Sequence, residues 1–138
     1  MNGLIQFLNT DLVLTSAEDL TALASSLDAA GLFPLQVALG DDGFWYAAFE
    51  TSADYDEPDT NIAAMLTCVE TLAPELKLVW SRCTLREFNI GYDCGKEPWA
   101  FNQGLSTEVL RRMAEVGATL RITLYPDRDG ENDQQRVG

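Results

Sequence analysis

Apolar and polar residues alternate in several short segments of the chain, which is the pattern of strands that bury one face. In the first half of the chain this pattern predicts three strands, at residues 4–14, 33–39 and 44–51. The sequence Gly-Asp-Asp-Gly at residues 40–43 predicts a hairpin turn between the second and third strands. Because Pro34 cannot donate to a strand ladder, the second strand is expected to begin late or to lie at a sheet edge.

Between these strands, apolar residues recur at spacings of three and four, which indicates amphipathic helices. The first helix is expected over residues 15–31. A capping box at its start would be formed by Thr15 with Glu18 or by Ser16 with Asp19. Further helices are expected at residues 58–73 and, as a short piece, at residues 76–80.

Residues 84–126 form the most regular part of the chain, and they read as strand, aromatic loop, helix and strand. Ser106 is a natural N-cap for this helix, and Gly117 can adopt the left-handed conformation that ends it. The last strand is expected to bury the face formed by its alternating apolar residues, Leu120, Ile122 and Leu124.

Together these elements predict a single α+β domain over residues 1–126. The first six elements follow the order β-α-β-β-α-β of a ferredoxin-like fold, and a further α-β unit extends this core. About five strands are expected in one sheet, with helices packed on one face and the opposite face open. Residues 127–138 contain almost no apolar side chain and are expected to form a flexible acidic tail.

The run from Leu105 to Tyr125 has a Leu-Ser pair that opens a helix, two central arginines, and then Gly-Ala-Thr-Leu-Arg-Ile-Thr-Leu-Tyr. This run resembles the C-terminal half of the bacterial domain of unknown function 4279 family, and the resemblance extends over nearly the whole chain up to Pro126. It implies a small α+β protein. Some members of the family lie in neighbourhoods of toxin and immunity genes, and no catalytic residues are attached to the family.

The formal net charge of −13 is concentrated in the first half of the chain. Thirteen acidic residues and no basic residue precede Lys77, whereas nine acidic and nine basic residues lie from Lys77 onward. A surface built from the first half therefore carries negative potential. Nucleic acid is not expected as a partner, since phosphate contacts need a clustered basic surface. A basic protein is the partner that this charge favours.

Histidine is absent from the sequence, which excludes Ser-His-Asp triads, Cys-His dyads and His-ligated zinc. Cys94, close to Lys96, is the only thiol in a loop-like setting, but no base is near it in sequence. We therefore expect a non-enzymatic protein with no catalytic residue, no metal and no cofactor.

The three cysteines have no C-x-x-C spacing and cannot all pair, which fits free thiols in a reducing compartment. The N-terminal segment has no basic region or cleavage site typical of a signal peptide, and no apolar run approaches the length of a membrane span. A cytoplasmic protein that does not bind membranes is expected.

Acidic loops and two tryptophans form the candidate partner-binding site. The acids between residues 54 and 59 could supply oxygen ligands to a cation, but they lack the glycine and the terminal glutamate of an EF-hand loop, which favours a solvated acidic loop. Trp99 and its neighbour Phe101 could either fold over the core or anchor a partner. The predicted contacts are Asp41, Asp42, Trp45, Asp54, Asp56, Glu57, Asp59 and Trp99.

A small-ligand or enzymatic cleft beside the sheet is the alternative function. Glu87 and Asp93 could act there as an acid/base pair, but such residues more often solvate an outward sheet face or meet Arg121 across the sheet. A homo-oligomeric domain of unknown role is a further alternative, in which the acidic composition only maintains solubility. The cleft residues would be Glu87, Tyr92, Asp93 and Arg121.

Overall fold

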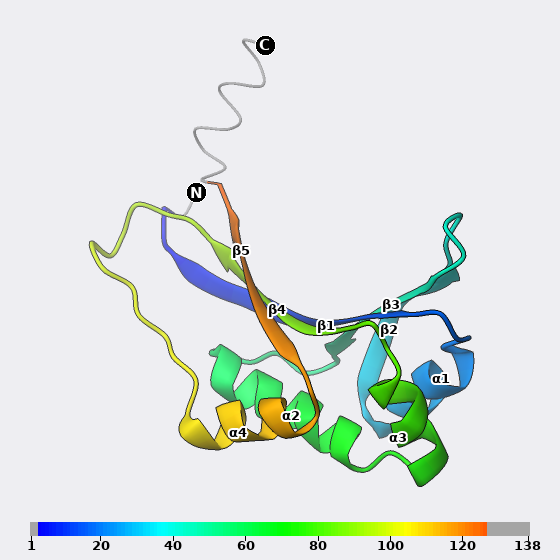
Figure 1. Ribbon diagram of the computed structural model, residues 1–138. Helices are drawn as coiled ribbons and strands as arrows, with labels where there is room; N and C mark the ends of the chain where they lie inside the picture. The colour runs from blue at the N-terminus through cyan, green and yellow to red at the C-terminus, as the bar shows by residue number, and fades with distance from the viewer. Residues whose placement is uncertain (1–2, 127–138) are drawn as a thin grey trace.

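The computed structural model describes residues 3–126, which form one five-stranded mixed sheet and four helices (Figure 1). The strand order is β2-β3-β1-β4-β5, and all neighbouring strands are antiparallel except β4 and β5, which are parallel. The α+β class and the single sheet of five strands are therefore confirmed. The elements are β1 (Gln6–Ser16), α1 (Thr21–Ala30), β2 (Leu32–Leu39), β3 (Trp45–Thr51), α2 (Pro58–Glu70), α3 (Pro74–Ser81), β4 (Leu85–Asp93), α4 (Thr107–Glu115) and β5 (Thr119–Tyr125).

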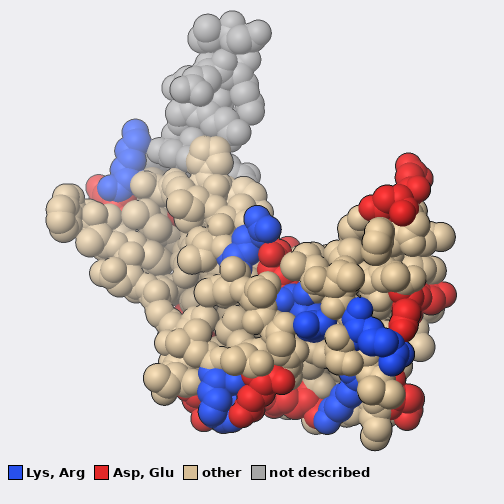
Figure 2. Space-filling view, viewed as in Figure 1, with Lys and Arg blue, Asp and Glu red and all other residues tan. Residues whose placement is uncertain are grey.

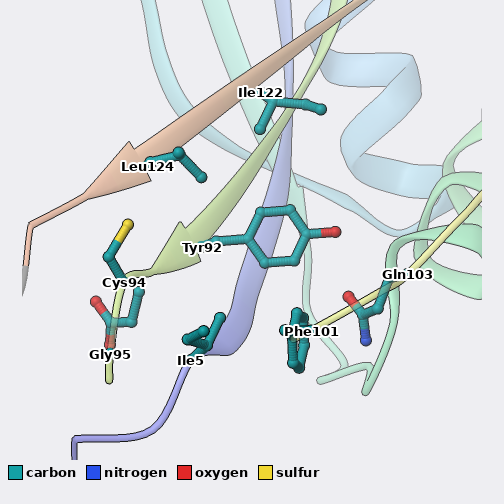
Figure 3. Close-up of a pocket in the computed structure, with 9 residues that line it drawn as sticks. Ile5, Tyr92, Cys94, Gly95, Phe101, Gln103, Ile122 and Leu124 are labelled. Carbon is teal, nitrogen blue, oxygen red and sulfur yellow. The ribbon is translucent and has the colours of Figure 1, made fainter. Parts of the chain in front are cut away.

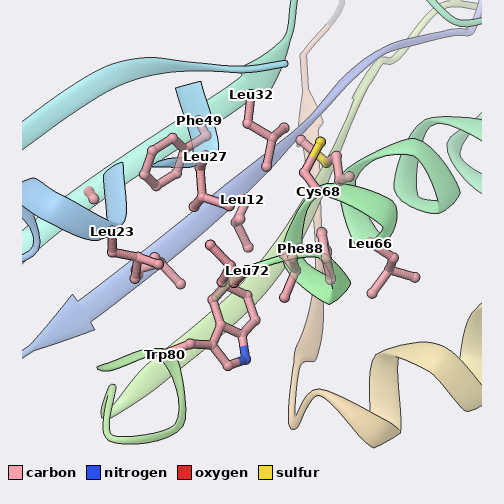
Figure 4. Packing of buried hydrophobic residues seen from close by; sticks show 14 of the residues in the cluster. Leu12, Leu23, Leu27, Leu32, Phe49, Leu66, Cys68, Leu72, Trp80 and Phe88 are labelled. Carbon is pink, nitrogen blue, oxygen red and sulfur yellow. The ribbon is translucent and has the colours of Figure 1, made fainter. Parts of the chain in front are cut away.

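All four helices lie on one side of the sheet, and no helix of residues 3–126 lies over the opposite side, which we call the uncovered face (Figure 1). The core fills the space between the two layers. Leu12 of β1 and Phe88 of β4 are fully buried there against Leu27 of α1 and Leu66 of α2 (Figure 4). Because strand residues alternate between faces, the neighbours of these core residues along the strands point to the uncovered face.

The predicted capping box at residues 15–19 is wrong, because β1 continues through these positions. Thr15 pairs with Tyr46 and Leu85, and Ser16 pairs with Trp45, so that α1 begins only at Thr21. Strand ladders on both sides hold the segment extended, and this outweighs the local capping preference.

The polar side chains of this segment form turns between β1 and α1 instead. The hydroxyl of Ser16 accepts a hydrogen bond from the backbone N–H of Glu18 at 3.0 Å, and the carboxylate of Asp19 accepts one from the backbone N–H of Thr21 at 2.7 Å. Leu20, the N-cap residue of α1, makes no side-chain capping hydrogen bond.

The hairpin of β2 and β3 is confirmed, and β2 lies at an edge of the sheet, as Pro34 predicts. The register between the two strands shifts between Pro34 and Gln36. This irregularity accommodates a residue that cannot donate to the ladder.

The short helix expected at residues 76–80 is present as α3, and polar contacts hold it against the end of α4. The indole N–H of Trp80 donates to the carbonyl of Val116 at 2.8 Å. The guanidinium of Arg86 donates to the carbonyls of Cys83, at 2.6 Å, and Gly117, at 2.9 Å. These bonds satisfy carbonyls that the helix ends leave open.

The β4-α4-β5 unit follows the prediction at the helix but not at the last strand. Ser106 caps α4 by accepting from the backbone N–H of Val109 at 3.2 Å, and Gly117 has a φ of 72° just after the helix. The expected burial of one face of β5 is wrong, since Ile122 is 58% exposed and Leu124 is 63% exposed. β5 lies at the edge of the sheet, beyond the part that α2 and α4 cover (Figure 1).

Within residues 3–126, no helix is long and apolar enough to cross a membrane. The predicted flexible tail at residues 127–138 lies outside the described residues.

Candidate functional site

The uncovered face of the sheet carries a set of hydrogen-bonded polar side chains from β1 and β3. The side-chain amide of Asn9 donates to the carboxylate of Asp11 at 2.9 Å and to the carboxylate of Glu50 at 3.5 Å. Asn9 and Asp11 alternate with the core residues Thr10 and Leu12 along β1, and Glu50 follows the core residue Phe49 on β3. One amide thus links two carboxylates on this face.

The two carboxylates affect each other electrostatically. Burial raises the pKa of the Asp11 carboxyl, and the negative charge of Glu50 raises it further, whereas the hydrogen bond from Asn9 lowers it. This combination of desolvation and like charge makes the ionised form of Asp11 costly. A cation placed against the pair would remove part of that cost.

β4 and β5 continue this polar face. Asn89 of β4 pairs in register with Asp11 of β1, and its side-chain oxygen accepts from the hydroxyl of Thr123 at 2.8 Å. Glu87 is only 7% exposed, and its carboxylate accepts from the guanidinium of Arg121 at 3.0 Å. The predicted contact between Glu87 and Arg121 across the sheet is confirmed.

The uncovered face therefore has more acidic than basic groups. Asp11, Glu50 and Glu87 contribute carboxylates, and Arg121 contributes the guanidinium that neutralises one of them. Basic side chains gather instead mainly over the helical layer, while the tip of the β2–β3 hairpin is acidic (Figure 2). A cationic partner would thus meet a favourable potential at this face and at the hairpin tip.

The predicted partner-binding acids fall into two separate groups. Asp41 and Asp42 lie in the turn before β3. The other acids lie in the loop after β3 and, for Asp59, in the first turn of α2. β3 has seven residues and therefore keeps the groups about 20 Å apart. The tertiary structure does not bring these loops together into one acidic patch.

Two of these acids also hold the fold in place. The carboxylate of Asp42 accepts from the hydroxyl of Tyr46 and from the backbone N–H of Phe44, and these bonds lower its pKa. The carboxylate of Asp59 accepts from the backbone N–H of Ser106 at 2.7 Å, which links the start of α2 to the start of α4. The remaining acids of the second loop are exposed, namely Asp54, Asp56 and Glu57.

The two candidate aromatic anchors have different environments. Trp45 is half-buried and packs against the core from the start of β3. Trp99 is 98% exposed in the loop between β4 and α4. Phe101, two residues later, folds back instead, and its ring contacts Tyr92 edge-to-face with 6.0 Å between the ring centroids. Only Trp99 projects fully into solvent.

The four residues of the alternative cleft do not converge. Glu87 and Arg121 form their ion pair on the uncovered face, whereas Tyr92 lies on the helix side and contacts Phe7 and Phe101. Burial raises the pKa of the Tyr92 hydroxyl. Asp93 is six strand positions from Glu87, about 20 Å along β4, so the two carboxylates cannot act on one bond.

An apolar groove that the sequence patterns did not reveal lies beside β5 on the helix side. Tyr92, Phe101, Ile122 and Leu124 line a cavity of about 410 Å³, with Cys94 at its rim (Figure 3). A second cavity of about 270 Å³ shares Tyr92 and Ile122 and continues toward α4. The alternation of β5 is the signal in the sequence, but alternation alone predicts a buried face rather than a groove.

The remaining thiols and acids add no further site. Cys68 and Cys83 are buried and Cys94 is partly exposed, and all three cysteines are free. Among residues 3–126, no three cysteine or carboxylate side chains are grouped closely enough to hold a metal ion.

Comparison with family models, curated proteins and solved structures finds no match to this chain. The resemblance to the domain of unknown function 4279 family stays a prediction.

Proposed function

We propose that this protein is a non-catalytic binding protein that holds a basic partner protein against the uncovered face of its sheet. It would act as an immunity protein or an inhibitor does, by covering the functional surface of the partner. The observation that carries this proposal is the pair of Asp11 and Glu50, two carboxylates linked by Asn9 on a sheet face that no helix covers. A lysine or arginine of a partner is the complement of such a pair.

The energetics favour a cationic ligand over a neutral one. Burial and the nearby charge of Glu50 both disfavour the ionised form of Asp11. An incoming ammonium or guanidinium group offsets both effects. The overall charge of −13 adds long-range attraction, which speeds encounter with a basic protein and disfavours anionic competitors. Asp41 and Asp42 at the hairpin tip extend the same negative potential beyond the sheet.

We further assign the first four strands to a ferredoxin-like core. β3 lies between β1 and β2, and β1 lies between β3 and β4, so each β-α-β connection skips one strand position. Such interrupted units, with all helices on one side, define the split βαβ arrangement.

We also propose that the protein is cytoplasmic, because its three cysteines are free thiols and a reducing compartment keeps them so.

Nuclear magnetic resonance titration with an oligo-lysine peptide tests the proposed face. The side-chain amide signals of Asn9 and Asn89 should shift at low salt and return toward their free positions as salt is added, since the interaction is electrostatic. The double variant Asp11→Asn, Glu50→Gln should bind the peptide about tenfold more weakly. A matched control with the same change in net charge is Asp28→Asn, Glu75→Gln, which alters α1 and α3 on the other side of the sheet.

The two double variants also serve as baits for the natural partner. A basic protein captured by the wild type and by the Asp28/Glu75 variant, but lost with the Asp11/Glu50 variant, supports the proposal. Equal loss of binding in both variants would show that net charge alone acts, and the proposed face would then have no specific role.

A further inference from the structure

The two edges of the sheet are built differently. β2 carries Pro34 and a register shift, which are features that discourage pairing with another strand. β5 contains no proline, and its register with β4 is regular over Thr119–Tyr125. Its one charged residue, Arg121, is held by Glu87 on the uncovered face. Of the two edges in the described part of the chain, β5 is the one open to strand addition.

The backbone of β5 presents its unsatisfied groups on the outer side at defined residues. The carbonyl of Tyr125 accepts from the backbone N–H of Cys94, at 2.9 Å, and so points toward β4. Because the backbone groups of successive strand residues point to opposite edges, those of Leu120, Ile122 and Leu124 point away from β4. The same three residues carry the exposed apolar side chains of the strand, with Ile122 at their centre.

We propose that β5 pairs with β5 of a second copy of this chain, antiparallel and centred on Ile122. In this register, Ile122 faces its own equivalent, Leu120 faces Leu124, and the outward N–H and carbonyl groups of all three form about six hydrogen bonds between the chains. On the uncovered face, Arg121 lies opposite Thr123, so no like charges face each other.

The charge distribution selects this edge for contact between copies. Residues 3–84 carry thirteen acidic and only two basic side chains, so two copies repel through most surfaces of that part. The β4-α4-β5 segment, residues 85–126, is neutral. Its charged residues are Glu87, Asp93, Glu97, Glu108 and Glu115 against Arg86, Lys96, Arg111, Arg112 and Arg121.

The side chains around β5 also fit a second copy of the chain. In the proposed register the apolar stripes of both strands point to the helix side, where they would meet the exposed Leu110 of α4 and close the groove described above. A small apolar ligand would fill the groove but would leave the outward backbone groups of β5 unpaired. A second copy satisfies both, and it joins the two uncovered acidic faces into one continuous sheet.

Sedimentation equilibrium of the full chain tests the pairing. The wild type should reach twice the mass of one chain at concentrations up to about 100 μM. Added salt should strengthen this association, because it screens repulsion between the acidic parts, whereas salt weakens binding of a basic partner. This opposite salt dependence separates the pairing from the proposed function.

Matched edge variants locate the contact. Ile122→Lys should weaken self-association at least about tenfold. Phe33→Lys on the β2 edge, at a residue 53% exposed compared with 58% for Ile122, should leave it unchanged. Ile122→Pro is the second variant, because it removes only an outward N–H and an edge strand tolerates proline at such a position. Circular dichroism of each variant checks that it is folded.

The register is tested by oxidation in a Cys94→Ser background. Cysteines introduced by Ile122→Cys would lie about 5.5 Å apart between Cα atoms, within disulfide range, whereas those from Leu120→Cys would be more than about 10 Å apart. Rapid cross-linking of the first variant alone supports the proposal. A monomeric wild type, a dimer that survives Ile122→Lys and Ile122→Pro, or equal cross-linking at both positions would overturn it.

Discussion

The carboxylate of Glu87 lies 3.0 Å from the guanidinium of Arg121, and the two side chains differ sharply in exposure, at 9% and 61%. The pair joins β4 to β5, which are parallel neighbours at the edge of the sheet. A nearly buried carboxylate is thus neutralised by a base that reaches in from solvent.

Removing the base should therefore destabilise the protein. Arg121→Ala leaves the Glu87 carboxylate buried without its partner, and we expect a loss of about 1–2 kcal/mol in the free energy of unfolding, less than for a fully buried pair. Urea denaturation at pH 7 measures it. Adding Glu87→Gln should recover part of the loss, because a neutral amide is less costly to bury. No recovery in the double variant would contradict this account.

Arg112 of α4 makes several hydrogen bonds to side chains of α2. Its guanidinium donates to both carboxylate oxygens of Glu70, at 2.9 and 2.8 Å, and to the hydroxyl of Thr67 at 3.2 Å. Lysine cannot reproduce this forked geometry, so Arg112→Lys should cost about 1 kcal/mol in thermal or urea unfolding. Arg111→Lys is the control, since its bridges to Glu108 and Glu115 are exposed, and it should leave the stability unchanged.

The ion pair of Arg112 and Glu70 also predicts that the stability of the fold depends on pH. The hydrogen bonds from Arg112 lower the pKa of Glu70 below its usual value of 4.5. A depressed carboxyl pKa stabilises the fold above the unfolded value, and this contribution is lost as pH falls through the folded value. Acid unfolding of the wild type should therefore lose this term below about pH 4.5, whereas Glu70→Gln should lack it at every pH.

The contribution of Asp11 to stability should change with pH in the opposite direction. Burial and Glu50 raise its pKa above the usual 3.8, so the folded state binds the proton more tightly than the unfolded state. Its contribution therefore becomes less favourable as pH rises from the unfolded value through the raised folded value. Asp11→Asn should increase stability at pH 7, by under about 1 kcal/mol because solvent screens a half-buried carboxylate, and should flatten the pH dependence above pH 4. Unchanged stability between pH 4 and 7 in urea unfolding would argue against this assignment.

The tryptophans offer a test of the α3–α4 contact. Trp80→Phe keeps an aromatic ring in the core but removes the N–H that donates to Val116, and we expect a loss of about 1–2 kcal/mol in stability. Trp99→Phe, at a position 98% exposed, should change stability by less than about 0.5 kcal/mol. Comparable losses in the two variants, measured by thermal unfolding, would show that the hydrogen bond is not the source.

The sequence by itself determined the features that depend on neighbouring residues. Ser106 and Gly117 bound α4 because an N-cap hydroxyl and a left-handed glycine act within one turn of the chain. Pro34 placed β2 at an edge because a missing N–H excludes a central ladder. The strand order required more, since strand pairing joins segments far apart in the sequence.

Only the tertiary structure decided which faces are covered and which distant side chains meet. Ser16 has the local features of a helix cap, yet pairing with Trp45 keeps it in β1. Asp11 and Glu50 come from strands separated in the sequence by α1 and β2, and their proximity follows from the antiparallel pairing of β1 with β3. The alternation of β5 indicated a strand correctly, but periodicity states only that two faces differ. Whether the apolar face is buried depends on how far the helical layer extends, and here it ends before Ile122.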